Sequence, residues 1–275
     1  MPQRSMTDRA SAAWRRWAAR GPALLVALIS AACAEEPERD RVLILVVDGL
    51  RPDYVTAEIM PRLNALADSG VRAVAHHAVF PTVTRVNGPT IFTGRLPGGH
   101  GLLGNAVYLP EVDATRTLDM SSAADLSLID QATGGQLMTA RSLGEMLAEQ
   151  GLVYFAASSG SPGSGTLMNH RGAGAGLVHH DLTIPDTLGA IVAEVLGPVP
   201  EIAAGASSVP LVARAIDALL LIGLDRADAD VMAVWLTEPD GTAHARGIGA
   251  PETLEVLADV DAEIGRLLDG LAERR

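Results

Sequence analysis

The feature that most constrains the fold is an unbroken apolar run, Val42 to Val47 (VLILVV), that ends in Asp48-Gly49. A continuous β-branched run is typical of a strand covered on both faces of a parallel sheet. A second such run, Val231 to Leu236, leads into Thr237-Glu238-Pro239-Asp240. Both strands need helices on either side, so we expect an α/β fold with a mainly parallel sheet flanked by helices.

The rest of the chain supplies helical and extended patterns in alternation, bounded by glycine and proline. We expect helices at 61–69, 84–93, 141–150, 186–196, 208–223 and 251–273, and further strands at 71–79, 105–109 and 153–157. Residues 111–139 show no firm periodicity, and we expect an insertion or cap there. The Gly/Ser-rich stretches 158–165 and 172–176 are expected to be loops.

Composition excludes several classes of function. All 21 basic residues of the 275-residue chain are arginine. The lack of lysine excludes a P-loop lysine, a Schiff-base lysine and pyridoxal-phosphate chemistry. A formal net charge of −12 argues against nucleic acid as a partner, because backbone affinity depends on clustered positive charge. Cys33 is the sole cysteine, which excludes a disulfide framework and a cysteine-based zinc site.

The first 33 residues predict a bacterial-type export signal. Five arginines precede the short apolar stretch from Ala23 to Ala32, and small residues close it. Cys33 resembles the lipidated cysteine of a bacterial lipoprotein, which would anchor the protein to a membrane; the alternative is cleavage nearby with Cys33 incidental. Residues 34–41 form a short polar tether. We therefore expect an exported protein, periplasmic or anchored to the cell envelope.

Candidate functional side chains follow the two apolar strands. In open α/β sheets ligands lie beyond the carboxyl ends of the strands, where Asp48 and Asp240 both stand. His244, four residues after Asp240, adds a nitrogen ligand, and this mixture of donors suits zinc or a similar divalent ion. The plainer interpretation of Asp48-Gly49 is a turn, and His244 alone would be an ordinary loop histidine.

Thr84 stands at the expected start of a helix, with Asn87 three residues later. A plain threonine N-cap would explain the position structurally. The functional alternative is a hydroxyl nucleophile at a helix N-terminus, where phosphate is favoured. Because the sequence offers no obvious base nearby, activation of Thr84 would need a metal ion, and Asn87 could donate to a phosphoryl oxygen.

Four segments in order, VLILVVDGLRPDYV, MPRLNALADSGV, FPTVTRVNGPTIFTGRLPGGHGLLGN and LTEPDGTAH, make the sequence resemble a known family. This is the type I phosphodiesterase/nucleotide pyrophosphatase family, of the alkaline phosphatase superfamily. The resemblance is strong over 42–110 and clear over 141–157 and 230–270. It implies an alkaline-phosphatase-like core, of which residues 42–275 form the N-terminal part.

The resemblance also implies the chemistry. Asp48 and Thr84 would belong to one zinc site, with Thr84 as the nucleophile, and Asp240 and His244 to a second. Asn87 would contact the phosphoryl oxygen, and Thr82 is the rival nucleophile by proximity. Many members have Phe-Pro-Asn-His after the nucleophile, where this chain has Arg85-Val86-Asn87-Gly88, so the preference for nucleotides is open.

Family members continue with a further strand, an Asp-His-Gly segment and a later histidine, so the chain looks like an N-terminal fragment. We expect the edge beside Val231–Leu236 to be unpaired and the long C-terminal helix to be poorly anchored. We also expect weak zinc binding, aggregation and little activity from the chain alone. The pairs His76-His77 and His179-His180 are expected on strands, where neighbouring side chains point to opposite faces and share no metal.

The function expected is an exported, metal-dependent phosphoesterase that uses two divalent ions, zinc, to hydrolyse phosphodiester bonds of a small phosphorylated substrate. Phosphomonoester or phosphonate hydrolysis on the same core is one alternative. A non-catalytic lipoprotein that keeps the fold for binding is another. The sequence leaves the oligomeric state and the identity of the substrate open.

Overall fold

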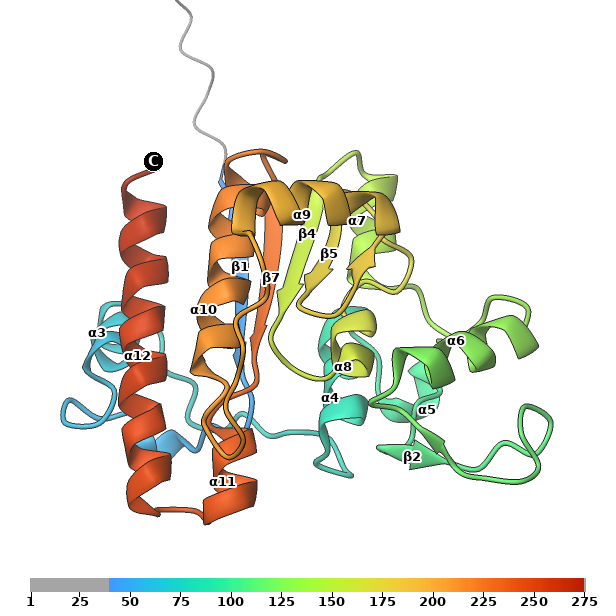
Figure 1. Ribbon diagram of the computed structural model, residues 1–275, viewed down its shortest axis with the longest axis horizontal. Helices are drawn as coiled ribbons and strands as arrows, with labels where there is room; N and C mark the ends of the chain where they lie inside the picture. The colour runs from blue at the N-terminus through green and yellow to red at the C-terminus, as the bar shows by residue number, and fades with distance from the viewer. Residues whose placement is uncertain (1–39, 275) are drawn as a thin grey trace, which may run out of the picture. The chain divides into compact units, whose positions relative to one another are not determined.

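The computed structural model describes residues 40–274, and the expected signal at 1–33 and the tether up to residue 39 lie outside them. Five strands form one sheet in the order β1-β7-β4-β5-β6, parallel except for β6 (Figure 1). The mainly parallel α/β fold is thereby confirmed. The strands are β1 (Val42–Val47), β4 (Tyr154–Ser158), β5 (Gly176–His179), β6 (Thr183–Ile184) and β7 (Val231–Leu236).

Helices cover both faces of this sheet because side chains alternate along its strands. On β7, Met232 and Val234 face one apolar cluster and Ala233 and Trp235 face another. The first cluster is covered by α3 (Pro61–Ser69), α9 (Gly189–Leu196), α10 (Val209–Asp217), its π-helical continuation Ala218–Leu224, and α12 (Pro251–Ala272). The second is covered by α4 (Thr84–Thr93) and α7 (Leu143–Glu149).

Shorter elements complete the described part of the chain. They are the 3-10 turns Pro52–Tyr54 and Asp186–Leu188, α5 (Pro97–His100), β2 (Ala106–Val107), β3 (Leu118–Asp119), α6 (Ala123–Ala132), α8 (Pro162–Thr166) and α11 (Asp240–Arg246). The predicted helices are thus all present, with small shifts at their ends. Among residues 40–274, no helix is long and apolar enough to cross a membrane.

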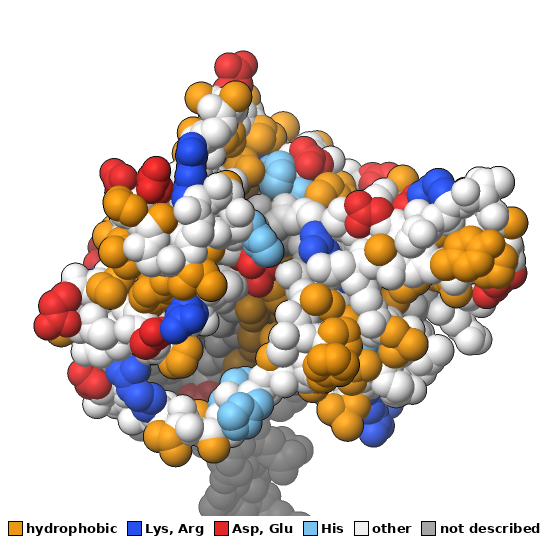
Figure 2. Space-filling view, turned by 90° about the horizontal axis from the view of Figure 1, so that it is seen from below, with side chains coloured by type: hydrophobic (Ala, Val, Ile, Leu, Met, Phe, Trp, Pro, Cys, Tyr) orange, Lys and Arg blue, Asp and Glu red, His pale blue; other side chains and the backbone are white. Residues whose placement is uncertain are grey.

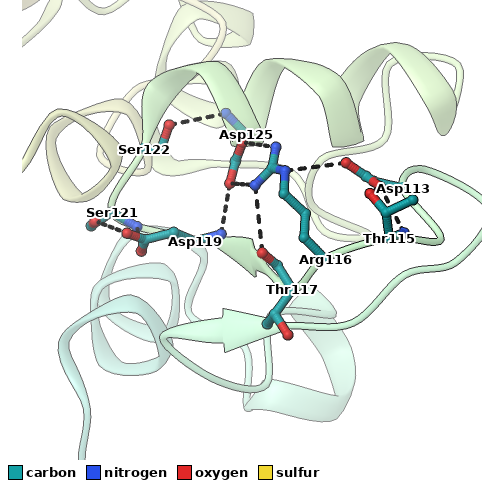
Figure 3. Close-up of polar contacts among 8 residues, drawn as sticks. All are labelled: Asp113, Thr115, Arg116, Thr117, Asp119, Ser121, Ser122 and Asp125. Carbon is teal, nitrogen blue, oxygen red and sulfur yellow. Dashed lines mark hydrogen bonds and ion pairs between the residues drawn. The ribbon is translucent and has the colours of Figure 1, made fainter.

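Residues 111–139, expected as an insertion or cap, contain β3 and α6 and share a small apolar core with flanking residues such as Leu102 and Leu167. An ion pair ties this region together (Figure 3). The Asp125 carboxylate accepts from Arg116 Nη1 at 2.8 Å and Nη2 at 2.7 Å, and also from the Asp119 amide at 2.7 Å. Arg116 is the leading cause that lowers the pKa of Asp125 to about 2.

The structure corrects two predictions about local structure, one of a strand and one of a loop. Residues 71–79 form no strand. Val71 and Val74 are each 96% exposed, and no neighbouring strand pairs with this segment. His76 and His77 are therefore not on a strand either. The Gly/Ser-rich stretch 158–165 is a loop only in part, because α8 begins at Pro162, capped by the Ser161 hydroxyl, which accepts from the Ser164 amide.

The expected weaknesses near the C-terminus are also wrong. The edge of β7 is paired on both sides, with Val231 opposite Val42 on β1 and opposite Tyr154 on β4. Within residues 40–274 the open edge on this side of the sheet is β1. The long helix α12 is well anchored, because it buries an apolar stripe in the core and its Asp261 carboxylate accepts from the Arg62 and Leu63 amides at the start of α3.

Candidate active site

The candidate site lies where the parallel strands end. Asp48 directly follows β1, α11 begins at Asp240 after β7, and α4 begins at Thr84 below the same end of the sheet (Figure 1). Figure 2 looks at this end and shows acidic and histidine side chains around a hollow in the middle of the face. This placement follows the general rule for ligand sites in open α/β sheets.

Thr84 and Asp48 are in contact. Thr84 Oγ1 donates to Asp48 Oδ2 at 3.3 Å, and Trp235 Nε1 donates to the same oxygen at 3.2 Å. Thr84 is the first residue of α4, and the N-cap position belongs to Val83, which makes no side-chain cap. The interpretation of Thr84 as a plain N-cap is therefore wrong, and its hydroxyl is directed to a carboxylate instead. The rival Thr82 is exposed.

Asp48 and Asp240 are brought together by a close approach of two backbone segments. The Asp240 amide donates to the Asp48 carbonyl oxygen at 3.2 Å. Gly49 has φ +72°, and a Cβ there would lie 2.8 Å from Asp240 Cα, so only glycine permits this approach. Burial, and then repulsion from the Asp240 carboxylate, raise the pKa of Asp48 to about 6.

Asp240 and His244 lie one turn apart on α11. His244 Nε2 is 3.5 Å from Asp240 Oδ1, and the His244 side chain is 82% exposed. The buried Glu238 fixes this turn, because its carboxylate accepts from the Thr242 and Ser208 amides. A hollow of ≈ 230 Å³ opens beside the pair, with Gly49, Arg51 and Tyr54 in its opposite wall.

These four side chains offer two donors to each of two divalent cations, which is fewer than the three protein ligands that a catalytic zinc normally takes. They offer two carboxylates, a hydroxyl and an imidazole, a donor mixture that zinc accepts. The Asp48 carboxylate is half-buried and repelled by Asp240, and a bound cation would relieve both penalties. Each proposed ligand pair is in contact, at 3.3 Å for Asp48 and Thr84 and at 3.5 Å for Asp240 and His244. Their assignment as metal ligands stays a prediction.

Asn87 is engaged by the segment that precedes α4. Its Oδ1 accepts from the Val79 amide at 2.9 Å, and its Nδ2 donates to the carbonyls of Val79, Pro81 and Val83 at 3.2 to 3.4 Å. These bonds hold the turn that delivers Thr84 to the site. A contact between Asn87 and a phosphoryl oxygen stays a prediction, and the amide would have to give up bonds to make it.

Sequence reasoning missed Asn105 and Trp235. Asn105 Oδ1 accepts from the Arg85 amide at 3.1 Å, which places a second side-chain amide against the first turn of α4. Its place in the loop before β2, just after Gly104, was the only signal in the sequence. Trp235 is buried in β7 between the core and Asp48, and its regular place in an apolar strand concealed this contact.

The histidine pair at the end of β5 departs from expectation. The rings of His179 and His180 lie 3.8 Å apart rather than on opposite faces, and with Asp181 they form a group that could hold a metal ion. Both His179 nitrogens are already used: Nε2 faces the Gly160 carbonyl at 2.8 Å, and Nδ1 accepts from the Asp181 amide at 3.0 Å. The group therefore fits a metal less well than Asp48, Thr84, Asp240 and His244 do.

The chain is similar in sequence to known proteins over most of its length. The sequence profile of the type I phosphodiesterase/nucleotide pyrophosphatase family matches residues 42–275. The chain is 28% identical over 248 residues to a venom phosphodiesterase of Macrovipera lebetinus, covering 89% of this chain and 25% of the relative. It is 25% identical over 246 residues to the rat ectonucleotide pyrophosphatase/phosphodiesterase family member 3, with 88% and 24% covered.

Solved structures show the same fold. The chain matches an inactive variant of murine ectonucleotide pyrophosphatase/phosphodiesterase 5 in complex with AMP, with a TM-score of 0.57 at 19% identity, over 86% of this chain and 53% of that one. It matches phosphonoacetate hydrolase from Sinorhizobium meliloti with a TM-score of 0.58 at 19% identity, over 85% and 54%.

The chain thus spans about a quarter of the length of these curated relatives and about half of these solved structures. Its fold is the alkaline-phosphatase-like fold of these two solved structures. The family profile covers the whole sheet and every residue of the candidate site. The chain therefore belongs to the type I phosphodiesterase/nucleotide pyrophosphatase family.

Proposed function

We propose that this protein is a metal-dependent phosphoesterase that hydrolyses phosphodiester bonds with Thr84 as the nucleophile. The observation that carries the proposal is the contact between Thr84 Oγ1 and the half-buried Asp48 carboxylate at 3.3 Å, at the carboxyl edge of the sheet. Membership of a family of phosphodiesterases and nucleotide pyrophosphatases supports the same reaction class.

Asp48 and Thr84 would hold one divalent ion, and Asp240 and His244 the other, with zinc the ion that this donor set favours. Such ions, when bound, lower the pKa of a coordinated hydroxyl and stabilise charge on the phosphoryl group and the leaving oxygen. The protein orients the reacting hydroxyl through the Asn87-held turn before α4. Asn105, fixed by the Arg85 amide, is placed to donate to a phosphoryl oxygen.

Hydrolysis of a phosphonate or a phosphomonoester is the second candidate. The fold is as similar to that of a phosphonoacetate hydrolase as to that of the murine relative in complex with AMP, and this similarity favours the second candidate. This candidate is also favoured by Arg85, which follows Thr84 directly and gives the site a cation.

The test of the main proposal is zinc-dependent hydrolysis of bis(4-nitrophenyl) phosphate, compared with 4-nitrophenyl phosphate. Thr84→Ala should lower the rate by roughly a thousandfold or more, since it removes the nucleophile of a covalent mechanism. Thr82→Ala is the matched control and should keep most of the rate. A Thr84→Ala variant with the rate of the unsubstituted protein would remove the nucleophile assignment. Loss of the hydrolysis rate in Thr82→Ala alone would assign the nucleophile to Thr82.

We further propose that residues 1–33 direct export, with Cys33 as the point of lipid attachment. The supporting observation is the arginine-rich start followed by a short apolar stretch that ends in small residues. The mass of the protein recovered from a bacterial envelope tests this directly. An unprocessed N-terminus would contradict export, and a processed but unlipidated one would contradict the role of Cys33.

A further inference from the structure

Arg85 follows the proposed nucleophile directly, and the diester mechanism above gives its side chain no role. It is the second residue of α4. Nη2 donates to Ser161 Oγ at 2.8 Å, and this hydroxyl is itself in contact with Ser164 Oγ at 3.0 Å. The side chain is thereby held in one direction rather than free in solvent.

The guanidinium is partly buried and does not use all of its hydrogen-bond donors. Arg85 Nε is buried and has no hydrogen-bond partner, and among residues 40–274 no carboxylate forms an ion pair with this side chain. Arg116, Arg171 and Arg266 each meet at least one carboxylate. Arg214, whose Nε is also buried without a partner, instead donates to three backbone carbonyls. An unpartnered buried donor on a charged group is costly, and an anion bound beside it would lower that cost.

The direction of Arg85 separates it from the reacting centre. Ser161 belongs to the loop after β4, whereas Asp48 and Asp240 follow β1 and β7. β4 is the neighbour of β7 on the side away from β1, and adjacent strands are about 4.8 Å apart. Thr84 and Arg85 are consecutive residues with Cα atoms about 3.8 Å apart, so an anion bound by Arg85 would lie within the length of a small substrate from the phosphorus attacked by Thr84.

From this geometry, and resting on the proposed phosphoesterase function, we propose that Arg85 binds a second anionic group of the substrate. The substrate class is a phosphoryl compound that carries a further carboxylate or phosphoryl group near the reacting phosphorus. A guanidinium presents paired N–H donors that match either oxyanion in two-point contact. Arg85 is thus a specificity-determining residue, and Ser161 positions it.

Equilibrium binding to the zinc-loaded protein, measured by titration calorimetry, tests this with three unhydrolysable probes. Methylenediphosphonate carries a second phosphoryl group, 3-phosphonopropionate carries a carboxylate, and ethylphosphonate carries neither. The unsubstituted protein should bind one or both of the first two more tightly than ethylphosphonate. Whichever binds more tightly identifies the second group as phosphoryl or carboxylate.

Arg85→Gln should weaken binding of the preferred two-anion probe by roughly tenfold or more, as expected for a lost charge-assisted contact. Binding of ethylphosphonate should change by less than about twofold, within the effect of one surface charge. Arg85→Lys, which keeps the charge, should lose less than Arg85→Gln. Arg95→Gln is the matched control, because Arg95 is exposed just beyond the other end of α4, and it should leave all three affinities unchanged.

Two results would overturn the proposal. One is an unsubstituted protein that binds the two-anion probes no more tightly than ethylphosphonate. The other is an Arg85→Gln variant that loses affinity equally for all three, which would place Arg85 on the reacting phosphoryl group itself. Failure of the proposed function is seen separately, as the absence of zinc-dependent hydrolysis of bis(4-nitrophenyl) phosphate by the unsubstituted protein.

Discussion

Asn87 separates what residue spacing can predict from what it cannot. Its spacing from Thr84 suggests a catalytic amide, but spacing cannot reveal that the backbone of residues 79–83 folds back onto the side chain and occupies it. Asp48, Asp240 and His244 were easier to place, because strand ends of a parallel sheet meet at one edge. Asn105 and Trp235 contact site residues that are distant in sequence, and no local pattern predicts such contacts.

Exchanging the two amides for alanine should therefore have different effects. Asn87→Ala should lower the free energy of unfolding by about 1 kcal/mol, because it leaves half-buried backbone groups of the 79–83 turn unpaired. Asn105→Ala should mainly lower turnover, by roughly a hundredfold or more if it donates to the phosphoryl oxygen. Urea unfolding and diester hydrolysis measure the two effects. A stable Asn87→Ala variant with strongly reduced turnover would instead support a phosphoryl contact for Asn87.

His179 should make stability depend on pH. Burial lowers its pKa to about 4. Between pH 6.5 and 4 this imidazole is therefore protonated in the unfolded chain but remains neutral in the folded protein. Its contribution is present above about pH 6.5 and is lost as the pH falls to 4, a change of about 3 kcal/mol. His179→Gln should show a correspondingly smaller loss of stability by urea unfolding over this range.

The exposed His76→Gln is the control for His179 and should keep the full pH dependence. An identical pH dependence in His179→Gln would show that other histidines produce the effect.

At the scale of elements, buried segments were predictable and exposed ones were not. β1, β7, α3 and α12 are recognisable because their apolar residues repeat with the period that the core requires. Residues 71–79 carry the same residue types, yet a strand also needs a neighbouring backbone, and none pairs with them here. The short helix α8 escaped prediction because Gly/Ser composition favours a loop, whereas the Ser161 cap at its start favours a helix.

The cap region should depend on one ion pair. Asp125→Asn should destabilise residues 105–139 by about 1–3 kcal/mol, because it weakens three hydrogen bonds to a largely buried carboxylate. Hydrogen exchange should then become faster in α6 and β3, with the main sheet unchanged. Asp113→Asn is the matched control: Asp113 also pairs with Arg116 but is more exposed, so its loss should have a smaller effect. Equal effects of the two changes would contradict the role given to burial.

At the scale of the molecule, the sheet brings residues from three distant parts of the chain to one edge. Asp48, Thr84 and Asp240 meet because β1 and β7 are neighbours and α4 packs beneath them, held by Trp235 and the glycine at position 88. The order of the strands was not predictable, since apolar patterns identify strands but not their neighbours. The expected open edge at β7 was wrong for this reason.

The central claim is that Asp48 with Thr84, and Asp240 with His244, form cation sites. The most direct measurement is the affinity for Zn²⁺, by competition with a chromophoric chelator, of the unsubstituted protein and of Asp48→Asn, Asp240→Asn and the distant control Asp186→Asn. The account predicts that each of the first two substitutions weakens zinc binding by roughly tenfold or more, while Asp186→Asn leaves it unchanged. Equal zinc affinity in all four proteins would contradict it.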